Sequence, residues 1–354
     1  MASVDRLPTQ ERPGRVVAKV AQAQERLASE VAKLQSGADW KNYLAFQARL
    51  HHYSPNNVLL IAAQHALAYE ERRVASPEAS YVAGFNTWRS LGRFVDKGQH
   101  GYAVLAPCSY DRQMAVDAAG NARRVGPDEP PRAGETSERR RVLAGFRVAY
   151  VFDVSQTSGA PIPEPPRPSL LEGEAPRGLG ASVVATVESQ GFRVDTVPSA
   201  AAIGGANGRT DAAERTVLIR GDMDDAAMVK TLVHEAAHVL LHTSPPGMDL
   251  ARPLKEVEAE SVAYVVAHVH GMSTDDYSFP YVASWAGESG VKAVQATQLR
   301  VARAARQIIE ASPAPHTTGG RAPGAEAAIT PHGVRRQVVA TEPSVTLEPA
   351  QVGV

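Results

Sequence analysis

Apolar residues recur at helical spacing in the first seventy positions of the chain. Over residues 15–35 they are Val16, Val20, Leu27, Val31 and Leu34. This spacing predicts an amphipathic helix, and residues 40–50 show a similar pattern. The apolar run over residues 58–68 follows turn residues that can cap a helix. The chain is therefore predicted to begin with three helices.

Shorter apolar runs follow, and they predict strands. Residues 102–107 and 146–154 are rich in β-branched and aromatic side chains. Between them, residues 111–141 are rich in Arg, Glu, Gly and Pro. We predict that this polar segment is a mobile insertion loop.

A proline-rich segment separates the two halves of the chain. Six prolines lie between residues 158 and 177, so residues 158–178 are predicted to form a semi-rigid linker. The pattern beyond it predicts helices at 181–190, 224–242, 253–270 and 290–311, and strands at 192–197 and 215–220. Residues 312–354 hold few large apolar side chains, which predicts a disordered tail.

Length and composition indicate a two-domain α+β protein. At 354 residues the chain exceeds the usual span of one domain, and 44% hydrophobic residues support ordinary cores. We predict a mixed helix and sheet domain over 16–157 and a second domain over 179–311. One cysteine, no signal peptide and no long apolar segment favour a cytoplasmic protein with no membrane partner.

The charge distribution differs between the two halves. Residues 1–155 carry a formal charge of +5 and residues 156–354 carry −6, for a net charge of −1. A basic N-terminal half suits a phosphate-bearing partner, but the excess is small for a protein held to nucleic acid by charge. Charge alone therefore identifies no partner.

The segment TLVHEAAHVLLH contains the pattern HExxH. His234 and His238 are four residues apart, so on a helix both imidazoles project from one face and can bind one metal ion. Glu235 lies beside them as a candidate general base. We predict one Zn²⁺ per chain, with a third protein ligand and an open position for water.

The third ligand is predicted to come from the helix at 253–270. Glu256 and Glu260 share one helical face, whereas Glu258 points to another. We assign Glu256 as the ligand and Glu260 as the partner that orients a ligating imidazole, with the reverse assignment also open.

His242 is excluded as the third ligand by distance. Eight residues of helix separate it from His234 by about 12 Å, too far for both to bind one ion. The metzincin pattern is also excluded, because Leu241 and Ser244 stand where it requires glycine and histidine.

This ligand set predicts peptide hydrolysis. Zinc would lower the pKa of a water molecule, and Glu235 would take its proton and later deliver it to the leaving amine. The sequence does not rank the candidates for an oxyanion donor, which are Tyr264, His268, His270, Tyr277 and Tyr281.

The C-terminal half resembles the zincin-like peptidases of the ImmA/IrrE type, in which an ExxA(D/N/E) helix, here at residues 256–260, follows the HExxH helix. The N-terminal half resembles the ArdC-like antirestriction domain through YSPNNVLLIAAQ (53–64), WRSLGRFVDKGQHGYAVLAP (88–107) and YVFDVSQTSG (150–159). Together these resemblances imply a single-stranded-DNA-binding module coupled to a gluzincin-like metallopeptidase domain.

Single-stranded DNA is held by aromatic stacking and by cations that contact phosphates. The residues that offer these groups are Trp88, Arg89, Arg93, Lys97, His100 and Tyr102. The alternative is an ordinary hairpin with Trp88 in the core.

Two functions compete. The first is a zinc metalloendopeptidase that cleaves a protein or peptide substrate. The second is an antirestriction protein that binds single-stranded DNA and whose metal is mainly structural. Glu235 favours the first, because a structural metal site needs no general base. A module with neither metal nor DNA ranks last.

Overall fold

The computed structural model describes residues 13–34, 36–118, 121–126, 129–162, 173–275, 290–313, 316 and 319–321. The helices are α1 (Pro13–Ala32), α2 (Gly37–Arg49), α3 (Pro55–Glu70), α4 (Phe85–Ser90), α5 (Leu179–Ser189), α6 (Asp225–His242), α7 (Arg252–Val269) and α9 (Gly290–Ala311). The strands are β1 (Val82–Gly84), β2 (Arg93–Val95), β3 (Tyr102–Val116), β4 (Ala122–Arg124), β5 (Thr136–Asp153), β6 (Thr157–Gly159), β7 (Arg193–Val197), β8 (Gly208–Asp211) and β9 (Thr216–Arg220). This mixed content confirms the predicted α+β class.

Helices α1, α2 and α3 form the first layer and confirm the helical start of the chain. Ser36 caps α2 in a reciprocal capping box with Asp39, and Ser54 caps α3. On the flank of α3, the Asn57 side-chain amide donates to the Leu105 carbonyl at 3.0 Å and accepts from its N–H at 2.8 Å. This pair of hydrogen bonds attaches α3 to strand β3. Asn57 therefore links the two elements in addition to lying in the first turn of α3.

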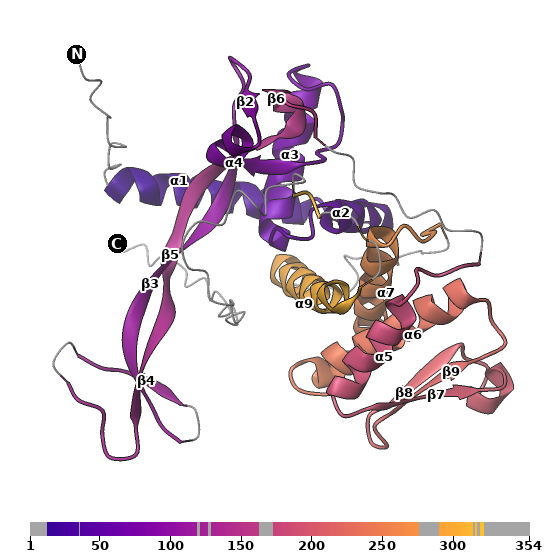
Figure 1. Ribbon diagram of the computed structural model, residues 1–354. Coiled ribbons are helices and arrows are strands. Elements are labelled where there is room, and N and C mark those ends of the chain that lie inside the picture. Colours follow the sequence, from indigo (N-terminus) through magenta and orange to yellow (C-terminus); the bar gives the residue numbers. More distant parts are fainter. Residues whose placement is uncertain are drawn as a thin grey trace, which may run out of the picture.

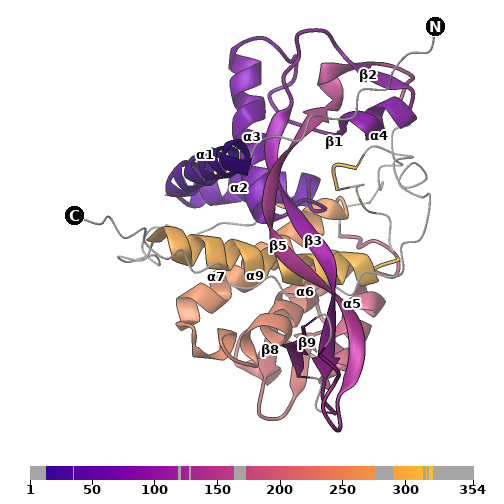
Figure 2. The ribbon, with the colours of Figure 1, turned by 90° about the vertical axis from the view of Figure 1, so that its left-hand side faces the viewer.

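Strands β3 and β5 form a long antiparallel hairpin, whose outer end projects away from the helices in Figure 1 and which runs from top to bottom across Figure 2. The strands predicted at 102–107 and 146–154 form its base. The insertion loop predicted over 111–141 is wrong for 111–116 and 136–141, which continue the ladder to the pair Val116–Thr136. Most of its residues are polar and its apolar ones are consecutive, at 114–116, so it lacks the alternation that marks a half-buried strand.

The second half contains a three-stranded sheet in the order β7-β9-β8, where β7 is parallel and β8 antiparallel to β9. The helices and strands predicted beyond residue 180 are all present. Strand β8, at Gly208–Asp211, was not predicted, because its four residues carry no large apolar side chain.

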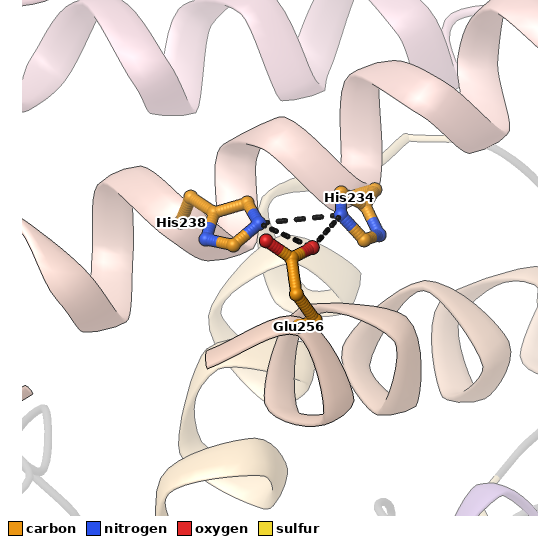
Figure 3. A group of neighbouring side chains, drawn as sticks. All are labelled: His234, His238 and Glu256. Atoms are coloured by element: carbon orange, nitrogen blue, oxygen red, sulfur yellow. Dashed lines mark hydrogen bonds and ion pairs between the residues drawn. The ribbon is translucent and has the colours of Figure 1, made fainter. Parts of the chain in front are cut away.

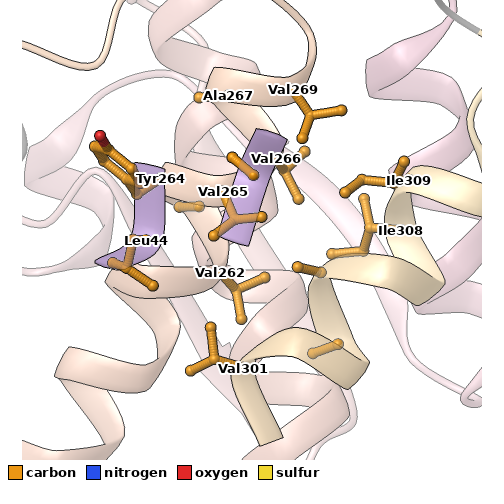
Figure 4. Close-up of a cluster of buried hydrophobic side chains, with 14 of the residues drawn as sticks. Leu44, Val262, Tyr264, Val265, Val266, Ala267, Val269, Val301, Ile308 and Ile309 are labelled. Carbon is orange, nitrogen blue, oxygen red and sulfur yellow. The ribbon is translucent and has the colours of Figure 1, made fainter. Parts of the chain in front are cut away.

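One hydrophobic core runs through both halves of the chain. Side chains of α7 meet Leu44 of α2 and Ile308 and Ile309 of α9 in this core (Figure 4). At the same contact, the Trp40 indole N–H donates to the Ser261 hydroxyl at 2.9 Å. The segments predicted as two domains therefore share a continuous core.

The predicted linker and tail lie mostly beyond the described part of the chain. Residues 163–172 and 322–354 are outside it. Within it, the Gly320 carbonyl accepts a hydrogen bond from the Val82 N–H at 2.8 Å, so residues just past α9 contact the N-terminal half. No helix in the described segments is long and apolar enough to cross a membrane.

Candidate metal centre

Helix α6 carries the HExxH pattern. It begins after Asp224, whose carboxylate accepts a hydrogen bond from the Ala227 N–H at 2.8 Å and so caps the first turn. Its apolar face is buried, with Val233, Ala236 and Ala237 in the core. His234 and His238 are half-buried and border a cavity of about 840 Å³.

Helix α7 packs against α6 and supplies the carboxylates. Glu256 and Glu260 both reach His234 of α6. Glu258 is fully buried and lies between His242 of α6 and helix α9. This is the arrangement that helical spacing predicts for residues two and four apart.

Three donor atoms converge between the helices (Figure 3). The Nε2 atoms of His234 and His238 are 3.2 Å apart, and the Glu256 carboxylate oxygen Oε2 lies 3.5 Å and 3.6 Å from them. Ligands bound tetrahedrally to zinc at about 2.1 Å are about 3.4 Å from one another. Two imidazole nitrogens and one carboxylate oxygen at these separations fit a divalent transition metal.

The remaining nitrogen of His234 is occupied. Its Nδ1 lies 3.1 Å from Oε2 of Glu260. Nδ1 can therefore carry the proton and donate it to the carboxylate, which leaves the Nε2 lone pair directed at the other two donors. The structure thus brings Glu256 to the metal-facing nitrogens and Glu260 to the outer one.

Charges around His234 favour its protonation when no metal is bound. Burial alone lowers the pKa of His234, but hydrogen bonds to Glu256 and Glu260 and the charge of Glu235 outweigh it and raise the pKa to about 9. The hydrogen bonds from His234 and His238 hold the pKa of Glu256 well below its usual range. The carboxylates around His234 therefore favour a positive charge at this imidazole, or at a metal ion that replaces its proton.

Glu235 is buried and borders the same cavity. Its Oε2 accepts a hydrogen bond from the Thr210 hydroxyl at 2.6 Å. Strand β8 approaches closely at Gly208, where an added Cβ would lie 2.8 Å from Cγ of Glu235. Only glycine permits this approach without displacing the Glu235 side chain.

The cavity has one wall of helix and one wall of strand. His234, His238, Glu256 and Glu260 line it from α6 and α7, and residues 208–210 of β8 line it from the other side. Strand β8 is at the edge of its sheet, so its outer backbone groups are positioned to pair with an extended chain.

His242, which was excluded as a ligand, lies next to His238 on the side away from the three donors. Its Nδ1 is 3.0 Å from Nδ1 of His238, and its Nε2 is 3.1 Å from Oε2 of Glu258. Glu258 also accepts hydrogen bonds from Thr297 and Arg300 of α9. Arg300 could not be predicted as a partner of Glu258, because no local pattern relates two residues 42 positions apart.

The candidate oxyanion donors that the structure describes are outside this cavity. Tyr264 is buried and stacks on His268, and His270 is fully buried. None of these three lines the cavity. Tyr277 and Tyr281 fall outside the described residues.

The candidate DNA-binding residues divide into buried and exposed groups. Trp88 and Tyr102 are core residues, whose polar atoms bond to the Phe152 carbonyl and to His65. Their rings offer no open face to a base. Arg93 is bound to Thr157 and to the Ala160 carbonyl, and the exposed side chains are Arg89, Lys97 and His100.

Two solved structures are similar to this chain. The metal-free crystal structure of the antirestriction ArdC protein from plasmid R388 is 18% identical and has a TM-score of 0.42, over 73% of this chain and 85% of that one. The Mn(II)-bound structure of the same protein is 17% identical and has a TM-score of 0.39, over 73% of this chain and 88% of that one.

Sequence comparison gives one curated relative and one family. An uncharacterised protein of Bacillus anthracis is 25% identical over 264 residues, which are 68% of this chain but 42% of that protein. This chain therefore matches less than half the length of that relative. Residues 13–152 match the model for the N-terminal domain of anti-restriction factor ArdC.

Proposed function

We propose that this chain is an ArdC-like antirestriction protein whose divalent metal centre hydrolyses a peptide bond. The observation that carries the proposal is the triangle of donors formed by His234, His238 and Glu256, with sides of 3.2, 3.5 and 3.6 Å. A carboxylate, Glu235, borders the same cavity. The family match in the N-terminal part supports the antirestriction role.

A divalent ion held by these donors would supply Lewis acidity, which lowers the pKa of water and polarises a carbonyl group. Glu235 would accept the proton of that water. Thr210 donates to Oε2 of Glu235 and fixes the orientation of the carboxylate, which leaves Oε1 to receive the proton and later pass it to the leaving amine.

An extended peptide is the substrate class that fits the cavity. Residues 208–210 of β8 form one wall, opposite the metal-binding helices. A peptide paired with the free edge of β8 would lie along the cavity, and its carbonyl groups would pass the donor triangle. Pairing with a strand involves only backbone groups of the substrate. Its side chains would be selected by the cavity residues outside β8.

The test separates metal binding from hydrolysis. We would load wild-type protein, Glu235→Gln and the exposed control Glu214→Gln with Zn²⁺ or Mn²⁺ and incubate each with a library of unstructured peptides. Mass spectrometry would detect cleavage. We expect cleavage by the wild type and the control, and none by Glu235→Gln, which should retain its metal. Equal cleavage by Glu235→Gln would remove Glu235 from its role.

A second candidate function is binding of single-stranded DNA, with the metal as a structural element. The observation that favours it is the arginine content of the β3–β5 hairpin. Arg112 and Arg140 lie directly opposite each other in the ladder, and Arg139, Arg141 and Arg147 are exposed. Like charges in opposite positions destabilise a two-stranded ribbon, so an anionic partner would stabilise it.

Antirestriction in cells distinguishes the two candidates. Restriction of unmodified plasmid DNA would be measured in cells that produce wild-type protein, Glu235→Gln or Arg139→Ala/Arg141→Ala. Loss of protection in Glu235→Gln alone supports hydrolysis. Loss in the arginine variant alone supports DNA binding, and a weaker salt dependence of oligonucleotide affinity in that variant and in Lys97→Ala would support it further.

A further inference from the structure

Beneath the metal centre, a chain of polar side chains runs from His238 into the core. It passes from His238 to His242, then to Glu258, and ends at Arg300 and Thr297 of α9. His242 and Glu258 are buried, and Glu258 has no exposed surface. These groups do not line the donor triangle, and the hydrolysis proposed above makes no use of Glu258 or Arg300.

The donor and acceptor of each hydrogen bond in this row of side chains follow from the contacts of Glu258. Arg300 donates through Nε at 2.9 Å, and Thr297 donates at 3.1 Å, both to Oε1 of Glu258. An ionised carboxylate only accepts. The Nε2 atom of His242, 3.1 Å from Oε2 of Glu258, must therefore carry a proton and donate it.

The position of the proton on His238 follows in the same way. When His242 is neutral and protonated at Nε2, its Nδ1 is an acceptor. This Nδ1 lies 3.0 Å from Nδ1 of His238, and two such nitrogens in contact share one proton. His238 must then donate from Nδ1, which leaves the lone pair of its Nε2 facing His234 and Glu256.

We propose that Glu258, held by Arg300, acts through His242 as a positioning residue that fixes His238 in its metal-binding tautomer. The proposal deepens the proposed function and rests on its metal centre. The metal ligands lie on α6 and α7, whereas Arg300 lies on α9, so a third helix determines which nitrogen of His238 is available.

Three substitutions test the donor-to-acceptor order of these hydrogen bonds. In Glu258→Gln, the amide oxygen must serve Arg300 and Thr297, so the amide NH₂ faces His242. His242 then accepts at Nε2 and donates from Nδ1, and His238 is left with its proton on Nε2. His242→Phe removes the hydrogen bonds that connect His238 to Glu258. His242→Gln preserves the direction, because its carbonyl can accept from His238 while its NH₂ donates to Glu258.

We would measure Zn²⁺ affinity by chelator competition, and the tautomer of His238 in the metal-free protein from its ¹⁵N chemical shifts. We expect Glu258→Gln and His242→Phe to weaken zinc binding about 10- to 100-fold, the range for outer partners of metal ligands. His242→Gln and the exposed control Glu310→Gln should remain within about threefold of the wild type. In Glu258→Gln the proton of His238 should move from Nδ1 to Nε2.

Circular dichroism would verify that each variant is folded, and a misfolded Glu258→Gln leaves the two His242 variants to decide. Folded variants with unchanged zinc affinity and an unchanged His238 tautomer would overturn the proposal. A wild type that binds no metal would instead defeat the proposed function, and the ¹⁵N shifts would still decide whether the chain fixes the tautomer.

Discussion

Two histidine–carboxylate pairs join α6 to α7, and they differ in surroundings more than in geometry. His234 lies 3.1 Å from Glu260, and His242 lies 3.1 Å from Glu258. The side chains of the first pair are 23% and 35% exposed, and those of the second are 4% and 0% exposed. The same contact therefore lies beside an open candidate metal site in one place and is sealed from solvent in the other.

Compensating charge explains the difference. The buried Glu258 is paired with Arg300 as well as His242, so its charge is balanced within the protein. Around His234, Glu256 is paired with Arg252 at 3.7 Å, but the Arg252 side chain is 90% exposed, so it balances the charge of Glu256 only weakly. Weakly balanced negative charge beside a cavity suits a bound cation.

The largest expected effect is the loss of metal from the open site. His238→Ala removes one of three donors, and we expect the bound metal to fall from one ion per chain to none. Native mass spectrometry after removal of excess zinc would measure this stoichiometry. His268→Ala, which alters a histidine outside the donor triangle, should keep its metal. Retained metal in His238→Ala would contradict the assigned centre.

Substitution at the sealed pair should lower the stability of the protein. Arg300→Met leaves the Glu258 carboxylate buried without its main partner, which should lower the free energy of unfolding by about 3–5 kcal/mol. Urea denaturation of the metal-free protein would measure it. The exposed neighbour Arg303 gives the control, because Arg303→Met should change stability by less than about 0.5 kcal/mol. A small effect in both variants would show that Glu258 is neutral in the folded protein.

Metal binding at the open site should depend on pH, because it displaces a proton from His234. The pKa of His234 is raised from 6.5 to about 9 in the metal-free protein. The protonated form therefore stabilises that state fully below pH 6.5, and this contribution is lost as the pH rises through 9. Metal must displace the proton, so binding at pH 7 should release about one proton, and affinity should rise about tenfold per pH unit up to pH 9. Calorimetry in buffers of different ionisation enthalpy would count the protons.

The smallest effect should come from the partly exposed carboxylate of the open pair. Glu260→Gln removes the charge beside Nδ1 of His234 but keeps an acceptor oxygen. We expect about a tenfold loss of zinc affinity and less than about 1 kcal/mol of stability, measured by chelator competition and urea denaturation. A loss of stability as large as that of Arg300→Met would remove the distinction between the two pairs.

Periodicity was sufficient to predict features that depend on a single helix. The shared face of Glu256 and Glu260, the separate direction of Glu258 and the exclusion of His242 as a ligand all follow from 3.6 residues per turn. The structure places these side chains accordingly. The functional roles assigned to them stay predictions.

Features that depend on distant segments could not be predicted in this way. The pairing of Arg300 with Glu258 and of Trp40 with Ser261 joins residues far apart in the sequence. The outer part of the hairpin was taken for a loop because its residues are mostly polar and its few apolar residues do not alternate with them. Trp88 shows a further limit, since an aromatic residue near basic ones suits either a binding surface or a core, and here it is fully buried.

Helix α9 sets an order of assembly during synthesis of the chain. It supplies Arg300 to Glu258 and Ile308 to the core, and Arg306 donates to the backbone carbonyl of His51 at 2.7 Å. These partners precede it in the sequence, so they leave the ribosome first. We expect the nascent chain to hold an incomplete core and an unset His238 until residue 311 has emerged, and to acquire its metal only then.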